Sequence, residues 1–258
     1  MERQIANDTH MQTIYILWLR QIKRYLRSKS RIVGSLGQPI LFLVALGYGL
    51  GPVFQKAGQG NYITFLAPGI ITMSILFTSI FSGIEIIWDR QFGFLKETLA
   101  APVSRFHIMI GRTLGGATVA TAQGMIVFGI AFIAGFRVYS WTLVLPAILV
   151  MALIALLFTA LGTAIASRLE DMQGFQLIMN FLVMPLFFLS GALFPLQGLP
   201  KALSLVASFD PLSYGVDALR ALLINTAHFG LTADLIVLGA VTLFFLWLGS
   251  YFFSKIEV

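Results

Sequence analysis

The charged side chains at the ends of the long apolar runs are the first candidates for chemistry in this sequence. Glu85 and Arg112 each lie about one helical turn inside an apolar run, at a similar depth. Because an ionised side chain in lipid is costly unless it is paired, we expect these two to form an ion pair. The pair is either a relay into the helical bundle or an ordinary pair at the membrane interface.

Residues for catalysis or metal binding are sparse. The sequence has no cysteine, and its histidines, His10, His107 and His228, are far apart. No glycine is followed by lysine, so there is no Gly-x-x-x-x-Gly-Lys-Ser/Thr loop to cradle ATP phosphates. His-Glu-x-x-His and Gly-x-Ser-x-Gly are also absent. We expect no catalytic residue, no metal site and no cofactor bound by this chain, so any ATP and Mg that drive it belong to a separate subunit.

The elements that position these residues are membrane spans. Hydrophobic residues make up 58% of the chain and charged residues 11%, whereas soluble domains carry about 25% charged residues. A span needs roughly 20 mostly apolar residues, and six runs qualify. They are 32–54, 62–88, 106–136, 141–166, 175–194 and 231–253. The sequence therefore predicts an all-α membrane protein in which residues 1–258 form a single transmembrane domain.

Lysine and arginine predict the orientation. With the N-terminus inside, 13 of the 17 lysines and arginines fall in cytosolic segments, as the positive-inside rule requires. We therefore expect a multi-pass protein with both termini cytosolic and no signal peptide. The net charge of +6 is better explained by topology and contact with anionic membrane lipids than by nucleic-acid binding.

The segment 10–30 predicts an amphipathic helix lying in the membrane interface. Its apolar face holds Met11, Ile14, Tyr15, Trp18, Ile22, Tyr25 and Leu26. Its basic face holds Arg20, Lys23, Arg24, Arg27 and Arg31. The helix either only anchors the N-terminus or also contributes to docking a partner.

Two further segments lie between spans. Residues 90–103, between spans two and three, predict a short cytosolic helix with Phe92, Leu95 and Leu99 on one face. That apolar face needs a cover, either lipid headgroups or another protein. Residues 195–225, between spans five and six, contain two apolar pieces that are too short to span. They predict an external re-entrant helix pair, which is tolerated only where protein or a wet cavity covers it.

Three stretches, in this order, resemble the type-2 ABC transporter permeases, membrane subunits of bacterial exporters of drugs and lipid-linked glycans. Residues 90–105 are similar to the pattern R-x-x-G-[TS]-x-[ED]-x-L-x-x-[TA]-P-[VI]-S-R. Residues 191–200 resemble S-G-x-x-[FY]-P-x-x-x-[LM]-P, and residues 210–220 resemble [NHD]-P-[LF]-[ST]-[YW]-x-x-[DE]-x-x-R. The chain departs from the first pattern at Gln91, where many members have Glu, and at Phe94, where they have Thr or Ser.

The resemblance implies a partner and a site for it. A separate ABC ATPase subunit would bind the cytosolic face, with residues 90–103 as the coupling helix that transmits its closure. Lys96 and Glu97 would supply charge contacts. The implied docking residues are Arg90, Phe92, Gly93, Leu95, Lys96, Glu97, Thr98, Leu99, Pro102 and Arg105, together with Arg20, Arg24 and Arg27.

The resemblance also implies a homodimer in the bacterial cytoplasmic (inner) membrane, with spans two and five lining a central cargo path. The candidate residues of this path are Met73, Phe77, Phe81, Met179, Asn180, Met184, Phe187 and Phe188. For any single one of these side chains, plain packing against neighbouring helices or lipid is the better explanation. As a cargo surface, methionine and aromatic side chains adapt to varied apolar molecules. They favour efflux of an amphipathic small molecule, such as a drug, or of a lipid-like cargo.

Other functions remain open on the sequence. An exporter of a polysaccharide or lipid-linked glycan would be expected to line its path with more aromatic and polar groups. An ion- or proton-coupled carrier would normally carry a titratable group at mid-membrane, which these runs lack. A membrane-embedded enzyme would cluster His, Asp or Glu at one leaflet, whereas the carboxylates here are scattered.

Overall fold

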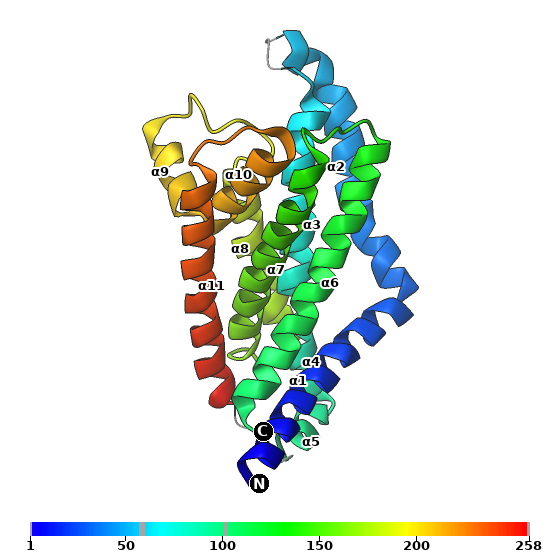
Figure 1. Cartoon of the computed structure of the whole chain (residues 1–258), viewed down its shortest axis with the longest axis vertical. Helices are drawn as coiled ribbons and strands as arrows, with labels where there is room; N and C mark the ends of the chain where they lie inside the picture. The colour runs from blue at the N-terminus through cyan, green and yellow to red at the C-terminus, as the bar shows by residue number, and fades with distance from the viewer. Residues whose placement is uncertain (1, 57–59, 101–102, 257–258) are drawn as a thin grey trace.

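The computed structural model describes residues 2–56, 60–100 and 103–256, and every regular element in these ranges is a helix (Figure 1). The predicted all-α fold class is confirmed, because six helical stretches in the described residues are long and apolar enough to span a membrane. Their elements are α2 (Lys29–Lys56), α3 (Tyr62–Phe81) with α4 (Ile84–Gln91), α6 (Arg105–Ile133), η1 (Trp141–Leu143) with α7 (Val144–Ala166), α8 (Met172–Leu189) and α11 (Leu231–Ser254). The chain is therefore a multi-pass membrane protein.

Helices α3, α6 and α7 form the centre of the bundle. In the α3–α4 stretch, 72% of the most apolar window is buried inside the protein, against 17% in α2 and in α11. The apolar side chains of these two outer helices are therefore mostly on the surface of the bundle. At the centre, a Cβ atom on Gly162 would lie 2.6 Å from the carbonyl oxygen of Ile80. Glycine thus allows the two backbones to touch, as in other membrane helix pairs.

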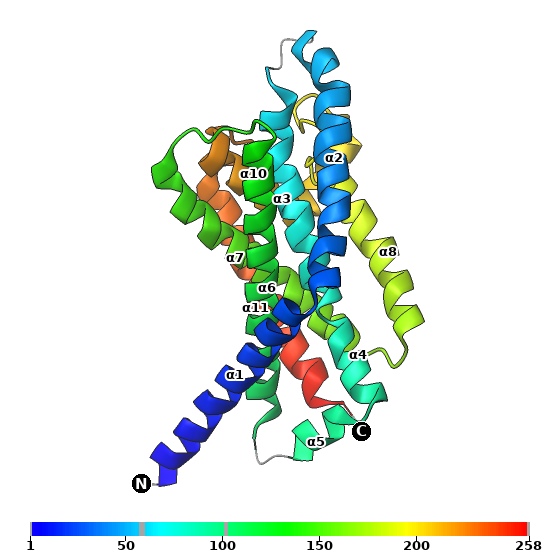
Figure 2. The same ribbon diagram turned by 90° about the vertical axis from the view of Figure 1, so that its right-hand side faces the viewer.

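Helix α1 (Glu2–Arg27) crosses the bundle obliquely and meets α2 at Ser28 (Figure 2). It packs along α6, where Gly111 gives it room: a Cβ there would lie 3.0 Å from the carbonyl oxygen of Ile14. The Trp18 indole donates a hydrogen bond to Thr118 Oγ1 at 3.0 Å. One side of α1 is thus covered by α6, and Leu17 is buried there, while Met11, Tyr15 and Leu26 remain exposed.

The predicted helix across residues 90–103 is broken in two, which corrects the sequence prediction. Helix α4 ends at Gln91, Gly93 adopts φ 81°, and α5 (Phe94–Ala100) begins in a new direction. Because a positive φ suits glycine and stops a helix, Phe92 and Leu95 do not share a face. Phe92 is 72% exposed, whereas Leu95 is completely buried. Pro102, the expected stop, lies outside the described residues.

At the end of the bundle opposite the two termini lie α9 (Lys201–Phe209) and α10 (Pro211–Ile224) (Figure 1). The side chain of Asp210 caps α10 by accepting a hydrogen bond from the Leu212 amide at 2.8 Å, and Pro211 occupies the first turn. Burial raises the pKa of Asp210 to about 7, against a smaller lowering effect of the Leu212 bond. The two short apolar segments predicted within residues 195–225 are thus the helices α9 and α10.

Arg220 of α10 contacts two other segments at this end of the bundle. Its guanidinium donates to the carbonyl oxygens of Gly191, at 2.8 Å, and Ala192, at 3.2 Å. It also stacks 3.8 Å from the centre of the Phe65 ring. Burial lowers its pKa to about 10, opposed by the nearby Asp217 carboxylate and the Tyr62 hydroxyl. The side chain thus fixes the loop that follows α8 against α3 and α10.

Candidate functional site

Six charged side chains form a cluster where α1, α2, α4 and α6 meet near the end that holds both termini. We call it the charge cluster: Glu85, Asp89, Arg20, Arg24, Arg31 and Arg112. Its two carboxylates lie one turn apart on α4, so both face the same neighbours. The cluster joins the consecutive helices α1 and α2 to α4 and α6, which lie much later in the sequence.

Arg112 pairs with Asp89 and not with Glu85, which corrects the predicted relay pair. The Arg112 and Asp89 side chains are 4% and 5% exposed, and Arg20 also reaches Asp89 at 3.1 Å. Glu85 instead accepts from Arg31 at 2.9 Å and lies 3.6 Å from Arg24. The reason is long-range: α1 folds back along α6 and brings its arginines to α4.

Beside this cluster a cleft of about 1090 Å³ lies between α1 and the α4–α5 turn. We call it the basic cleft. Four basic side chains of α1 line it, together with the aromatic side chains that follow α4. The principal residues are Arg20, Lys23, Arg24, Arg27, Trp88, Asp89, Phe92 and Phe94. Phe92 and Phe94 are 72% and 52% exposed, so an apolar edge stands next to positive charge.

The remaining predicted docking residues take different places. Lys96 and Glu97 are exposed, and Leu99 is half-buried. Arg90 donates to the carbonyl oxygen of Leu169 at 3.3 Å, which holds α4 to the end of α7. Arg105 donates to the carbonyl oxygens of Ser254 and Ile256 at 2.7 and 2.9 Å, and so holds the end of α11. Thr98 bonds back to the carbonyl oxygen of Phe94.

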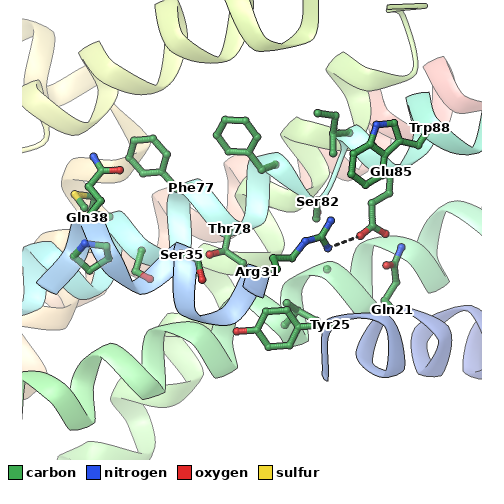
Figure 3. Close-up of a pocket in the computed structure, with 18 residues that line it drawn as sticks. Gln21, Tyr25, Arg31, Ser35, Gln38, Phe77, Thr78, Ser82, Glu85 and Trp88 are labelled. Carbon is green, nitrogen blue, oxygen red and sulfur yellow. Dashed lines mark hydrogen bonds and ion pairs between the residues drawn. The ribbon is translucent and has the colours of Figure 1, made fainter. Parts of the chain in front are cut away.

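A second cavity, which we call the inner pocket, lies between α1, α2, α3, α4 and α6 and has a volume of about 360 Å³. The predicted cargo residues Met73, Phe77 and Phe81 line it. Tyr25, also in its wall, bonds to the Gln123 amide oxygen, and burial raises the pKa of its phenol against a smaller effect of Arg31. Figure 3 shows the pocket with the Arg31–Glu85 ion pair at one end.

The five predicted cargo residues of α8 are not brought to this pocket. Met179 and Phe187 are buried in the bundle, and Phe187 stacks on Phe42 with ring centres 6.2 Å apart. Asn180, Met184 and Phe188 face outward from the described chain.

Sequence reasoning missed the polar side chains of the inner pocket. Ser35 and Gln38 lie three residues apart on α2, and Thr78 and Ser82 lie four apart on α3. Each pair therefore falls on one helical face. Weakly polar residues at helical spacing inside an apolar run are the signal that could have identified them.

The chain was compared with known proteins. A family model described as "ABC-2 type transporter" matches residues 12–224, which run from α1 to the end of α10. Nodulation protein J of Rhizobium meliloti (strain 1021) is 30% identical over 222 residues, covering 84% of each chain. The putative transport permease ycf38 of Porphyra purpurea is 32% identical over 227 residues, covering 84% of this chain and 75% of that relative. With six apolar helices in the described residues and this match across most of its length, the chain belongs to the ABC-2 type transporter family and is a transport permease.

Proposed function

We propose that this chain is the membrane-spanning subunit of an ATP-driven exporter that moves an amphipathic small molecule or lipid-like cargo out of the cytoplasm. A separate ABC ATPase subunit binds ATP and Mg and hydrolyses the nucleotide, since the sequence has no phosphate-binding loop of its own. The chain acts as a homodimer in the bacterial cytoplasmic membrane, with both termini cytosolic. Family membership and the clustering of lysine and arginine at one end support this proposal.

The exposed aromatic edge beside the basic cleft is the observation that carries the proposal. Large apolar side chains on a hydrophilic surface indicate an interaction site, and aromatic residues dominate the binding energy of protein interfaces. Phe92 and Phe94 have this exposure, and Lys96 and Glu97 offer charge contacts next to them. We assign the ATPase contact to this edge rather than to Leu95, which is completely buried.

The charge cluster gives the contact a route into the bundle. Helix α5 follows α4 directly after Gly93, and α4 carries both Glu85 and Asp89. Through them α4 is tied to α1, α2 and α6. A displacement of α5 that moves α4 would therefore also act on α1, α2 and α6 through these ion pairs. Arg20 and Arg24 belong to the charge cluster, whereas Arg27 is exposed and lies outside that cluster.

The docking claim is tested by co-purification of the full chain with its ATPase subunit. The double variant Phe92→Asp/Phe94→Asp should lose binding, since each buried aromatic anchor is worth about 2 kcal/mol or more, or roughly 30-fold in affinity. The matched control is Tyr139→Asp, which changes a 66% exposed aromatic residue whose amide donates to the carbonyl oxygen of Leu223 in α10, at the other end of the bundle. If the double variant associates with the ATPase subunit as strongly as the unchanged chain, the assignment of the contact to Phe92 and Phe94 is wrong.

The energy source is tested in liposomes. The permease reconstituted with the ATPase subunit should move cargo only when ATP is hydrolysed. Transport by the purified permease alone, at the rate of the complete assembly, would favour an ion-coupled carrier or a channel instead.

A further inference from the structure

The inner pocket has a polar wall and an apolar wall along its length. Figure 3 shows Gln38 at one end, the Arg31–Glu85 pair at the other, and Ser35, Thr78 and Ser82 between them. This polar row comes from two helices, α2 and α3, and from the start of α4. The Ser35 and Ser82 hydroxyls already donate to the carbonyl oxygens of Ile32 and Ser79, at 2.9 and 2.6 Å, and so offer a ligand their acceptor lone pairs. The Gln38 amide can both donate and accept. The row thus suits a ligand that carries several neutral hydrogen-bonding groups.

The apolar wall is formed by α3. The rings of Phe77 and Phe81 are nearly parallel, with centres 6.4 Å apart, and Met73 continues the same face. These side chains offer flat and adaptable contact to a ring or short chain. A molecule that lies along the pocket would therefore have its polar side on one wall and its apolar side on the other.

The charges in the wall cancel. Arg31 donates to Glu85 at 2.9 Å, and no other carboxylate, lysine, arginine or histidine lines the pocket among the described residues. A ligand with a net charge would have to break this pair or remain uncompensated, and both cost free energy because the Glu85 side chain is buried, at 4% exposed. An uncharged ligand leaves the pair intact.

One buried hydroxyl in the wall has no partner. Ser74 is 3% exposed, lines the pocket, and its Oγ makes no hydrogen bond within the described chain. Buried polar groups are normally satisfied, so an unpartnered hydroxyl beside the pocket is an exception. The volume of about 360 Å³ lies within the range of small-molecule sites, about 300–1,000 Å³.

We propose that the inner pocket, within a single copy of the chain, binds an uncharged amphiphile of drug-like size, with hydroxyl or amide groups on the polar row and its apolar part on Phe77 and Phe81. The identification of this ligand as cargo rests on the proposed exporter function. The binding site itself rests only on the geometry. A long glycan is too large for the pocket and is not its ligand.

Trp88 lines the pocket and gives a fluorescence signal. The full chain, with Trp18, Trp141 and Trp247 replaced by Phe, is placed in lipid nanodiscs without the ATPase. The probe is an octyl glucoside brominated on its alkyl chain, which is uncharged and carries hydroxyls. We expect saturable quenching of Trp88. Brominated fatty acid and brominated alkyltrimethylammonium probes should bind at least about tenfold more weakly.

Two glycines of α2 provide a matched pair of variants. A Cβ at Gly34 or at Gly37 would meet no atom within 4 Å, so the first carbon of a larger side chain is free of contacts at both positions, but only Gly34 lines the pocket. Gly34→Phe should raise the half-saturating probe concentration by about tenfold or more, and Gly37→Phe by less than about twofold. Equal responses of the two variants would overturn the proposal. So would quenching of Trp88 by brominated phosphatidylcholine that the glucoside does not displace, since a resident lipid would then occupy the pocket.

The two proposals fail in different ways. If Gly34→Phe leaves both probe binding and ATP-driven transport unchanged, the pocket assignment falls and the exporter stands. If the probe binds and Gly34→Phe blocks it, while transport proceeds without an ATPase, the binding site stands and the exporter function falls.

Discussion

Removal of the Asp89 charge is the sharpest test of how the charge cluster holds the bundle. Asp89→Asn keeps the shape of the side chain but leaves Arg112 as a buried cation without a counter-ion. The Arg112 side chain is 4% exposed, and its Nε and Nη1 atoms have no hydrogen-bond partner among the described residues. We therefore expect Asp89→Asn to lose most of the stabilisation that the Asp89–Arg112 ion pair gives to the bundle.

The expected loss of folding free energy follows from the burial of each partner. Breaking a buried ion pair by removing one partner costs about 3–5 kcal/mol. Arg20, which also contacts Asp89, is 41% exposed, so its loss should cost no more than about 1 kcal/mol. Arg20→Met is thus the matched control within the same cluster. The double variant Asp89→Asn/Arg112→Met leaves no buried charge without a partner, since Glu85 keeps Arg31, and should recover at least half of the loss.

The assay is reversible unfolding by SDS titration of the permease in mixed micelles, followed by circular dichroism. Asp89→Asn should unfold at a clearly lower SDS fraction than Arg20→Met and than the double variant. Equal stability of Asp89→Asn and Arg20→Met would refute the view that Arg112 depends on Asp89. A double variant no more stable than Asp89→Asn would do the same.

Two further predictions concern packing and pH. Gly162→Ala should destabilise the bundle by about 1–3 kcal/mol through overpacking, because its Cβ would lie 2.6 Å from the carbonyl oxygen of Ile80. The control Gly129→Ala, whose Cβ would have no atom within 4 Å, should leave stability unchanged or raise it by up to about 1 kcal/mol. Both are measured by the same SDS titration, and equal effects of the two variants would contradict the close approach of α3 and α7. Burial raises the pKa of Asp210 from 3.8 to about 7, so its protonated form stabilises the fold fully below about pH 4, and this contribution is lost as pH rises through about 7. Asp210→Asn should flatten that part of the stability profile from pH 4 to 8, and an unchanged slope would count against the assignment.

The sequence predicts the spans well because one local property decides them. A run of roughly 20 apolar residues has no stable place outside lipid, so length and hydropathy suffice. The cap of α10 was predictable for a similar reason, since Asp210 followed by Pro211 is a local signal. The fifth span was expected to continue to residue 194, but α8 ends at Leu189 before the turn at Gly191, which has φ 73°.

The failures depend on contacts between distant segments. Helical spacing placed Phe92 with Leu95, but Gly93 breaks the helix and α5 turns Leu95 into the protein. Depth alone paired Glu85 with Arg112, because the return of α1 along α6, which supplies partners for both carboxylates, leaves no local mark in the sequence. The inner pocket was half predicted: its α3 residues were identified, and its polar row was not.

The order of Asp89 and Arg112 along the chain has a consequence for biogenesis. An arginine in an inserting helix is penalised, by about 2.5–3.5 kcal/mol at the helix centre on the translocon scale and by less toward the ends. Arg112 lies near the start of a helix whose other residues are nearly all uncharged. Asp89 is synthesised 23 residues earlier. The carboxylate is therefore already at the membrane surface when the arginine leaves the ribosome, so the helix that carries Arg112 can enter lipid with its counter-ion in place.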